Sequence, residues 1–170
     1  ISVSNPDFLD LSQFVTLAST PVIIKEEVRF VNAQERNQKQ QALLAFVELW
    51  KRAWESDDVE HYLSFYSEKF RTGGSTYKSW AKRKRVLNKR IEQRKIHISD
   101  LSILESKNVV HVRFVQDYSS SNITDIGMKE LFITQENGQY KIISENWSRL
   151  KSPQPATLQY AYQDSEESAL

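Results

Sequence analysis

The sequence predicts an α+β fold in which three helices pack on one face of a curved, antiparallel four-stranded sheet. Apolar side chains recur at helical spacing in three stretches between residues 33 and 94. Four β-prone stretches follow between residues 96 and 150, and Asn137-Gly138 between the last two is a strong hairpin signal. Three helices followed by hairpin-connected strands indicate a sheet with its helices gathered on one face.

Each of the three helical stretches has recognisable residues at its start. Asn32 is suited to cap the first, 33–56, whose apolar face is Leu43, Phe46, Val47, Trp50 and Trp54. Asp57 and Asp58 precede a shorter helix that carries Val59, Tyr62, Leu63, Phe65 and Tyr66. Gly73-Gly74-Ser75 then interrupts the pattern, and Thr76 opens a third helix that extends to about residue 94.

The four β segments predicted after these helices are 96–105, 109–119, 124–136 and 139–150. Ser152-Pro153-Gln154-Pro155 ends the regular structure, and the acidic, serine-rich stretch 164–168 is typical of a mobile tail. We therefore expect one α+β domain over residues 32–150 and a mobile tail over residues 151–170.

The first 24 residues predict a strand–helix–strand unit. Residues 1–5 are β-prone, Asn5 can cap the helix that follows, and residues 22–24 form a short apolar strand. A unit of this size cannot bury a core by itself, so we expect residues 1–31 to be the remnant of another domain and a linker. Five of its apolar side chains should then lack a full set of contacts: Phe8, Leu11, Phe14, Val22 and Ile24.

The overall composition is that of a globular chain with a core. Of the 170 residues, 39% are hydrophobic and 11% aromatic, and the formal net charge is +1. This charge argues against a nucleic-acid partner, and no run approaches the roughly 18 apolar residues that a membrane-spanning helix needs. Because the chain has no cysteine, disulfides and thiolate zinc sites are excluded.

The N-terminal residues carry a family resemblance. Residues 1–8, Ile-Ser-Val-Ser-Asn-Pro-Asp-Phe, resemble the run that follows the nucleophilic cysteine of bacterial L,D-transpeptidases, which cross-link or trim peptidoglycan stem peptides. Residues 20–24 resemble that family's closing strand. The resemblance implies that residues 1–31 end such a catalytic domain, and that the parent is a periplasmic cysteine transpeptidase or carboxypeptidase.

The chain itself lacks the chemistry of that family. It contains no cysteine, so the nucleophile is missing, together with its histidine partner and the oxyanion donors. We therefore expect that this chain is not an enzyme by itself and uses no cofactor. The resemblance makes the upstream catalytic domain an expected partner, and the apolar side chains of residues 1–24 would also favour self-association as a homodimer.

The remainder of the chain resembles a second family. Three helices followed by four antiparallel strands resemble the cone-shaped nuclear-transport-factor-2-like (NTF2-like) fold, which polyketide cyclases and ketosteroid isomerases share. More narrowly, residues 40–150 are similar to the accessory domain that follows some Gram-negative L,D-transpeptidase catalytic domains. Four phrases carry this similarity, in order along the chain: 50–57 (WKRAWESD), 62–66 (YLSFY), 114–118 (FVQDY) and 145–147 (ENW).

Polar side chains occupy predicted faces that are otherwise apolar. Four of them do so, one on the third helix and three on the β segments: Lys84, Gln116, Lys129 and Glu145. Because an unpaired buried charge is costly, these groups should pair or line a wet cavity. We therefore predict a ligand pocket between the sheet and the helices, lined by Tyr77, Trp80, Lys84, Gln116, Tyr118, Lys129, Glu145 and Trp147.

The residue types in this pocket suit a ligand that bears a carboxylate, such as a peptidoglycan stem peptide or a sugar-linked lactyl group. In this hypothesis Lys84 binds the carboxylate, while Glu145 holds Lys129 or a ligand amine. The alternative is a structural Lys–Glu pair, or lysines that extend along the sheet edge to solvent.

Two other signals are weaker. Residues 78–95 are strongly basic, but a run of this kind is more often a solvated helix face than a phosphate-binding surface. His61, His97 and His111 show no metal-ligand spacing, so we expect no metal site. An isomerase-like dyad of His111 and Asp117 would lie on the strand face opposite Phe114 and would point away from the pocket.

Two classes of function remain. The first is a non-catalytic accessory domain of a periplasmic L,D-transpeptidase-like enzyme, which binds peptidoglycan or muropeptides or positions the catalytic domain. The second is a small-molecule enzyme of the polyketide cyclase or ketosteroid isomerase type, which would use pocket residues such as Glu145 and Tyr118. The N-terminal resemblance and the missing acid–base pair favour the first class.

Overall fold

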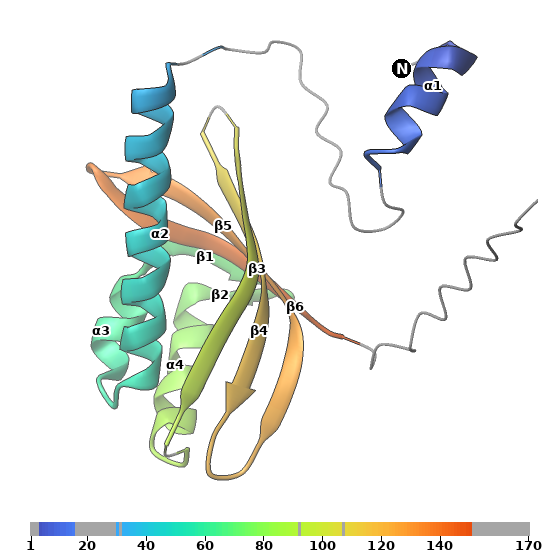
Figure 1. Ribbon diagram of the computed structural model, residues 1–170. Coiled ribbons are helices and arrows are strands. Elements are labelled where there is room, and N and C mark those ends of the chain that lie inside the picture. The colour runs from blue at the N-terminus through green and yellow to red at the C-terminus, as the bar shows by residue number, and fades with distance from the viewer. Residues whose placement is uncertain (1–3, 16–29, 31, 92, 107, 151–170) are drawn as a thin grey trace, which may run out of the picture. The chain divides into compact units, whose positions relative to one another are not determined.

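The computed structural model describes residues 4–15, 30, 32–91, 93–106 and 108–150. The chain divides into two compact units, residues 1–37 and 38–170, which are described separately. The described elements are four helices and six strands, shown in Figure 1.

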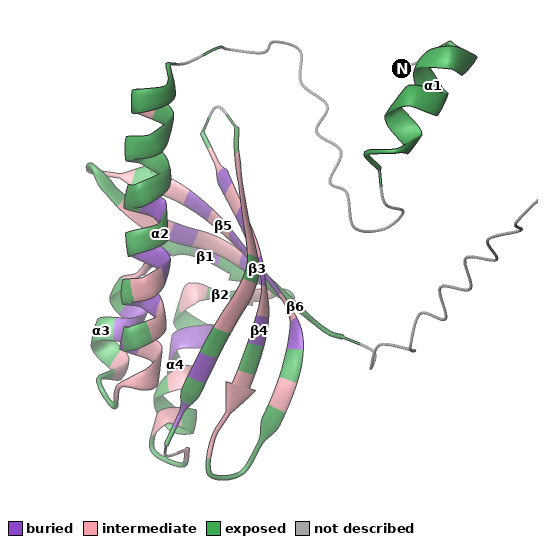
Figure 2. Ribbon diagram, in the orientation of Figure 1, coloured by how far each residue is buried: buried purple, intermediate pink, exposed green. Residues whose placement is uncertain are grey.

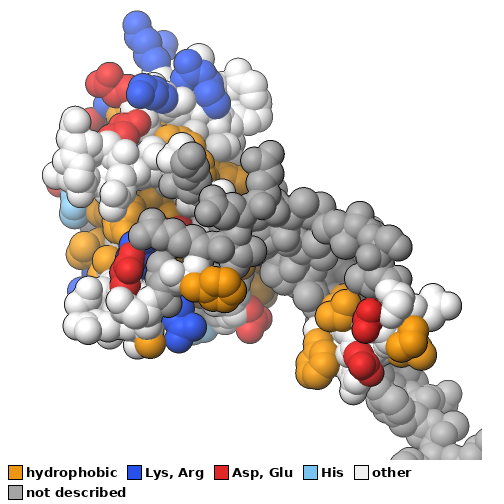
Figure 3. Space-filling view, turned by 90° about the horizontal axis from the view of Figure 1, so that it is seen from above, with side chains coloured by type: hydrophobic (Ala, Val, Ile, Leu, Met, Phe, Trp, Pro, Cys, Tyr) orange, Lys and Arg blue, Asp and Glu red, His pale blue; other side chains and the backbone are white. Residues whose placement is uncertain are grey.

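The first unit contains helix α1 (Asn5–Ser12). Ser4 caps it, because its side-chain oxygen accepts a hydrogen bond from the Asp7 backbone N–H at 3.3 Å. The expectation that Asn5 is the cap was therefore wrong by one residue. Phe8, Leu11 and Phe14 are exposed, Phe14 to 78%, and apolar side chains stand at the surface in Figure 3. The predicted strand 22–24 lies outside the described residues.

The second unit is built on a six-stranded mixed sheet. Its strands are β1 (Tyr66–Thr72), β2 (Ser75–Thr76), β3 (Lys95–Glu105), β4 (Val110–Ser119), β5 (Thr124–Glu136) and β6 (Gln139–Arg149). Their spatial order is β2-β1-β6-β5-β4-β3. All neighbouring pairs are antiparallel except β1 and β6, which run parallel. The last strand in sequence therefore lies inside the sheet.

The other helices are α2 (Ala33–Glu55), which belongs to the second unit from residue 38 on, and α3 (Val59–Ser64) and α4 (Tyr77–Asn88), which lie wholly within it. Their caps are the predicted ones, since Asn32 accepts from the Glu35 N–H, Asp58 from the His61 N–H and Thr76 from the Ser79 N–H. Buried residues of the helices and of the sheet face each other in Figure 2. The largest fully buried side chains form the centre of the core: Trp50, Trp80, Phe70 and Phe114.

The predicted α+β class is confirmed, but the sheet has two strands more than the four expected. Tyr66, assigned from the sequence to the end of the second helix, begins β1 instead. The spacing of Tyr62 and Tyr66 fits a helix, whereas the pairing that makes Tyr66 a strand residue comes from Ile142, far along the chain. No local sequence pattern predicts that a strand will pair in parallel with a strand so distant in sequence.

Helix α4 ends at Asn88 rather than near residue 94. Arg94 explains the early end, because its guanidinium donates to the carbonyl oxygens of Asn88 at 3.1 Å and Ile91 at 2.8 Å. A cationic side chain that occupies the carbonyls at a helix C-terminus stabilises the end of the helix there. A third bond, to the Ser56 carbonyl at 3.2 Å, ties this end of α4 to the end of α2.

The hairpin predicted at Asn137-Gly138 is confirmed. The two residues adopt φ values of 51° and 77°, and they join Glu136 to Gln139 in the register of β5 and β6. Positive φ at both central positions is the signature of a two-residue type I′ turn. This turn sets the register as far as Ile133 and Ile142, and a one-residue register shift before Phe132 then brings Lys129 of β5 near Glu145 of β6.

We expect Gly138→Ala to lower the free energy of unfolding by about 1 kcal/mol, because an L side chain is strained at positive φ. Denaturant unfolding followed by circular dichroism measures the change. The exposed neighbour Gln139, replaced by alanine, is the matched control. An unchanged midpoint for Gly138→Ala would show that the turn tolerates a side chain.

Candidate functional site

Three polar side chains lie buried on the sheet face that packs against the helices. Gln116 on β4, Lys129 on β5 and Glu145 on β6 are 4%, 5% and 7% exposed. The register places Lys129 between Phe114 and Trp147, and Glu145 beside Leu131. Alternation along β4 and β5 turns Gln116 and Lys129 toward the core, as the sequence pattern predicted. Glu145 faces the core for another reason: a register shift between β5 and β6 puts Ile142 and Glu145, three residues apart, on the same face.

Lys129 and Glu145 form a buried ion pair, with 2.8 Å between Nζ and Oε2. The same carboxylate oxygen accepts a hydrogen bond from the Tyr66 hydroxyl at 3.1 Å. Tyr66 in turn accepts from Trp50 Nε1 at 3.0 Å, and its oxygen lies 2.7 Å from the Tyr62 hydroxyl. The pair is therefore embedded in a polar network, which a buried charge needs in order to be tolerated.

The network fixes the protonation state of its members. Desolvation alone would raise the pKa of Glu145, but the ammonium groups of Lys129 and Lys84 and two hydrogen bonds outweigh it and hold the pKa below its usual value. Desolvation, assisted by the Glu145 charge, raises the pKa of Tyr62 and of Tyr66 well above the usual value. Glu145 stays ionised and both tyrosines keep their protons.

Lys84 has a different environment from Lys129. Its ammonium lies over three aromatic rings, 5.2 Å from the centroids of Trp54 and Trp80 and 5.7 Å from that of Tyr62. Among the described residues no side-chain or backbone acceptor lies within hydrogen-bonding distance of this nitrogen. We call Lys84 with these three rings the aromatic cage. It holds a cation whose hydrogen-bonding capacity is unused.

The pKa of Lys84 is lowered to about 8. Desolvation is the main cause; Glu145 opposes it, and the positive charge of Lys129 adds to it. The residue as a whole is half-buried, and its ammonium lies over the rings of the aromatic cage. A carboxylate brought to this nitrogen would restore the charged form.

Trp54 joins the two lysines, although the sequence indicated it only as a core residue of α2. Its ring lies 5.8 Å from Lys129 Nζ and stacks on Tyr118 at 5.6 Å with an interplanar angle of 27°. The sequence signal for this role is the position of Trp54 one helical turn after Trp50, near the end of the helix and away from the centre of the core. Tyr62 and Tyr66, also missed, resembled ordinary core positions in the same way.

Gln116 is the second group with an unused hydrogen-bonding atom. Its Oε1 is buried and has no partner among the described residues. Gln116 pairs with Gly127 across β4 and β5, and the Trp147 ring lies against that glycine. A Cβ at Gly127 would stand 2.5 Å from two atoms of the ring, so the glycine makes room for the tryptophan.

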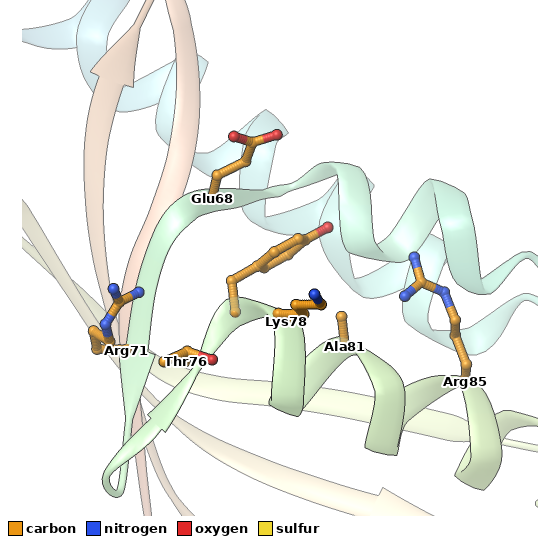
Figure 4. A pocket seen from close by; sticks show the side chains of 7 residues that line it. Glu68, Arg71, Thr76, Lys78, Ala81 and Arg85 are labelled. Atoms are coloured by element: carbon orange, nitrogen blue, oxygen red, sulfur yellow. The ribbon is translucent and has the colours of Figure 1, made fainter.

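Of the eight predicted pocket residues, the structure brings six into one cluster and places two elsewhere. Trp147 is 40% exposed, and its ring lies against Gly127. The prediction for Tyr77 is not met, because this residue lines a separate cavity of about 440 Å³ between β1, β2 and α4. Figure 4 shows Glu68 and Arg71 on β1 on one side of that cavity and Lys78 and Arg85 on α4 on the other.

Tyr77 was assigned to the pocket because it is spaced seven residues from Lys84. As the first residue of α4 it adjoins β2, and the chain reaches it from the edge of the sheet. Helical spacing therefore correctly identified residues that share one face of α4. It could not show that the Tyr77 end of this face lies away from the centre of the core.

The other polar signals lie away from this site. His111 Nε2 lies 3.1 Å from Glu130 Oε1, and the His111 ring stacks on Phe132, on the sheet face opposite Phe114. Within the described ranges no three His, Asp or Glu side chains lie close enough to hold a metal ion. No helix in the described part is long and apolar enough to cross a membrane.

Comparison with known families agrees with this geometry. The family model described as the Cds6 C-terminal NTF2-like domain matches residues 42–146. The chain belongs to this family. The cone-shaped NTF2-like fold expected from the order of helices and strands is thereby confirmed. The comparison with curated proteins found no match.

Two solved structures are similar to the chain beyond the fold. Bd1075 from Bdellovibrio bacteriovorus is 34% identical with a TM-score of 0.81; the alignment covers 88% of this chain and 54% of that one. The helical cell shape determining protein Pgp2 from Campylobacter jejuni is 29% identical with a TM-score of 0.65, over 85% and 52% of the two chains. The chain thus spans about half the length of these relatives.

A more distant structure shows the fold alone. The putative scytalone dehydratase from Novosphingobium aromaticivorans is 10% identical with a TM-score of 0.59, over 71% of this chain and 89% of that one. The NTF2-like fold therefore occurs both in a cell shape protein and in a protein named as an enzyme. Because the fold does not distinguish these functions, the function has to be argued from the residues of the site.

Lys129→Met should lower the free energy of unfolding by about 3–5 kcal/mol, because it leaves the buried Glu145 carboxylate without its cation. Adding Glu145→Gln should recover much of this loss. Denaturant unfolding of both variants measures it, with the exposed Lys82→Met as control. If Lys129→Met were no more destabilising than Lys82→Met, the ion pair would not be structurally coupled.

The lowered pKa of Lys84 predicts that stability rises with pH. Between about pH 8 and the ordinary lysine pKa near 10.4, the unfolded chain holds a proton on Lys84 that the folded chain has released. The free energy of unfolding should therefore increase across this window relative to Lys84→Met, which lacks the titration. Urea unfolding of the two proteins between pH 7 and 10 tests it, and parallel pH curves would contradict it.

Proposed function

We propose that this NTF2-like domain is the non-catalytic binding module of a periplasmic, L,D-transpeptidase-like cell-wall enzyme, and that it engages peptidoglycan stem peptides through Lys84. The observation that carries the proposal is the ammonium of Lys84, held in the aromatic cage without an acceptor. Glu145, the nearest buried carboxylate, is already engaged by Lys129 and Tyr66. An external carboxylate is the partner that Lys84 lacks.

The remaining side chains suit such a ligand. The site carries two lysines and one glutamate, so it has an excess of one positive charge when Lys84 is protonated. Trp54, Trp80 and Tyr118 provide apolar walls, and Gln116 provides a neutral polar group. Apolar walls with a few convergent polar groups are the usual composition of a small-molecule site.

The choice of a cell-wall ligand rests on similarity. One of the relatives is named as a cell shape determining protein, and the chain spans about half of it. The first 24 residues resemble the end of an L,D-transpeptidase catalytic domain, and the described part of that segment exposes Phe8, Leu11 and Phe14. These side chains suit packing against an upstream catalytic domain, or self-association.

A small-molecule enzyme is the second candidate. It is favoured by Lys84, whose lowered pKa would let it exchange a proton near neutral pH. It is disfavoured by the other groups, since Glu145 is ionised and bound by Lys129, and Tyr66 holds its proton. A lysine without a complementary acid or base suits binding better than turnover.

Lys84→Met should weaken binding of a stem tetrapeptide about 10-fold or more, since a charge-assisted hydrogen bond contributes about 1.5–3 kcal/mol. The fold should persist, because the substitution removes a charge that has no protein acceptor. Isothermal titration calorimetry measures the affinity, and mass spectrometry should find the tetrapeptide uncleaved, as expected for a chain without a nucleophilic cysteine.

Lys82→Met, an exposed lysine on the same helix, is the matched control and should bind like the parent. Equal affinity of Lys84→Met and the parent would refute the role of Lys84. If the unsubstituted chain turned over the peptide or a dehydratase-type substrate, this result would favour the second candidate, a small-molecule enzyme.

A further inference from the structure

We infer that the site recognises the free C-terminal residue of a peptide, with Lys84 binding its carboxylate and Gln116 Oε1 accepting the N–H of the last peptide bond. This inference rests on the proposed function and narrows its ligand. It distinguishes a stem peptide end from a sugar-linked lactyl group, which presents an ether oxygen where the peptide presents an N–H.

The first support is the state of Gln116. Its side chain is 4% exposed and lies on the core face of β4, between Phe114 and Tyr118. Its Oε1 has no hydrogen-bond donor among the described residues. A buried acceptor left without a donor costs about 1–3 kcal/mol, so a glutamine at this place is costly unless something supplies a donor.

The second support is that the other buried polar groups of the site already have hydrogen-bond or ion-pair partners. Glu145, Lys129, Tyr66 and Trp50 are joined by hydrogen bonds or an ion pair. Two groups stand outside this network: the Lys84 ammonium, a donor without an acceptor, and Gln116 Oε1, an acceptor without a donor. A ligand that satisfies both must carry an anionic acceptor and a neutral donor.

The two groups belong to the same region of the core. Lys84 lies over the Trp54 ring, and Tyr118, two residues from Gln116 on the same strand face, stacks on that ring. In the C-terminal residue of a peptide one carbon atom separates the N–H from the carboxylate. This is the closest spacing of a neutral donor and an anionic acceptor that a peptide offers, and internal residues whose α-carboxyl group forms a peptide bond lack it. An internal residue linked through its side-chain carboxyl keeps the same pair, and the C-terminal amide, which leaves that residue unchanged, tells the two apart.

Trp147 gives a route to Gln116. Its ring lies against Gly127, the register partner of Gln116, and is 40% exposed. A ligand that reaches Gln116 displaces or stacks on this ring, so Trp147 is the side chain whose environment binding should change.

The test uses three probes: a stem tetrapeptide, its C-terminal amide, and a depsipeptide in which an ester oxygen replaces the last peptide N–H. Calorimetry with the purified chain should find both analogues bound about 10-fold or more weakly than the tetrapeptide. The ester loses the donor that binds Gln116, and the amide loses the negative charge that pairs with the Lys84 ammonium.

Two variants assign the two effects to their residues. Gln116→Met, similar in length and apolar, should lose the preference for the peptide over the ester and keep the preference for the acid over the amide. Lys84→Met should keep the preference for the peptide over the ester and lose the preference for the acid over the amide. Asp117→Asn, an exposed neighbour on β4, should keep both preferences, and thermal unfolding checks that each variant folds.

The outcomes separate this inference from the proposed function. Equal affinity for tetrapeptide and depsipeptide, with Lys84→Met still impaired, would overturn the role of Gln116 and leave the carboxylate site standing. Tighter binding of the depsipeptide would show that Gln116 presents its NH₂ group and prefers a lactyl-type ligand, which overturns the inference. No binding of any probe would overturn the inference and the proposed function together.

Discussion

The ion pair between Lys129 and Glu145 is the constraint on which the rest of this core depends. Two opposite charges inside a protein are tolerated only when their remaining hydrogen-bonding atoms are also satisfied. Glu145 therefore needs Tyr66, and Tyr66 is held by Trp50 and Tyr62. One polar chain thus links β5 and β6 to β1, α2 and α3, and it fixes how the helices sit on the sheet.

The same hydrogen-bond network explains why the pKa of Lys84 is lowered. The network has one carboxylate for two lysines, and Lys129 holds it at 2.8 Å. Lys84 receives only the electrostatic attraction of Glu145 from a distance and the faces of three rings, which together do not compensate for its desolvation. Lys84 therefore makes no hydrogen bond or ion pair within the described residues, because the network holds one carboxylate for two lysines.

Much of this fold could be predicted from the sequence, because the signals involved are local. Caps such as Asn32 and Thr76, the helical spacing of α2 and the Asn137-Gly138 turn act over a few residues. Strand β1 could not be predicted, since its pairing with Ile142 depends on a residue distant in sequence. For the site, alternation identified Gln116 and Lys129, because facing direction is a local property of a regular strand. Glu145 faces the core through the register shift between β5 and β6, which alternation does not show. The sequence pattern could not show that Trp54 joins the two lysines or that Tyr77 lies elsewhere, since both depend on where a helix ends relative to the sheet.

The parallel pairing of β1 with β6 has a consequence for how the chain reaches its native state. Strand β1 cannot pair with β6 until residues 139–149 have left the ribosome, and β6 separates β1 from β5 in the finished sheet. Until then the helices have only part of a surface to cover, and Glu145 is not yet beside Lys129. Contacts between residues so distant in sequence slow folding. The Lys129–Glu145 pair and the candidate site around it are therefore among the last parts of the domain to form during synthesis.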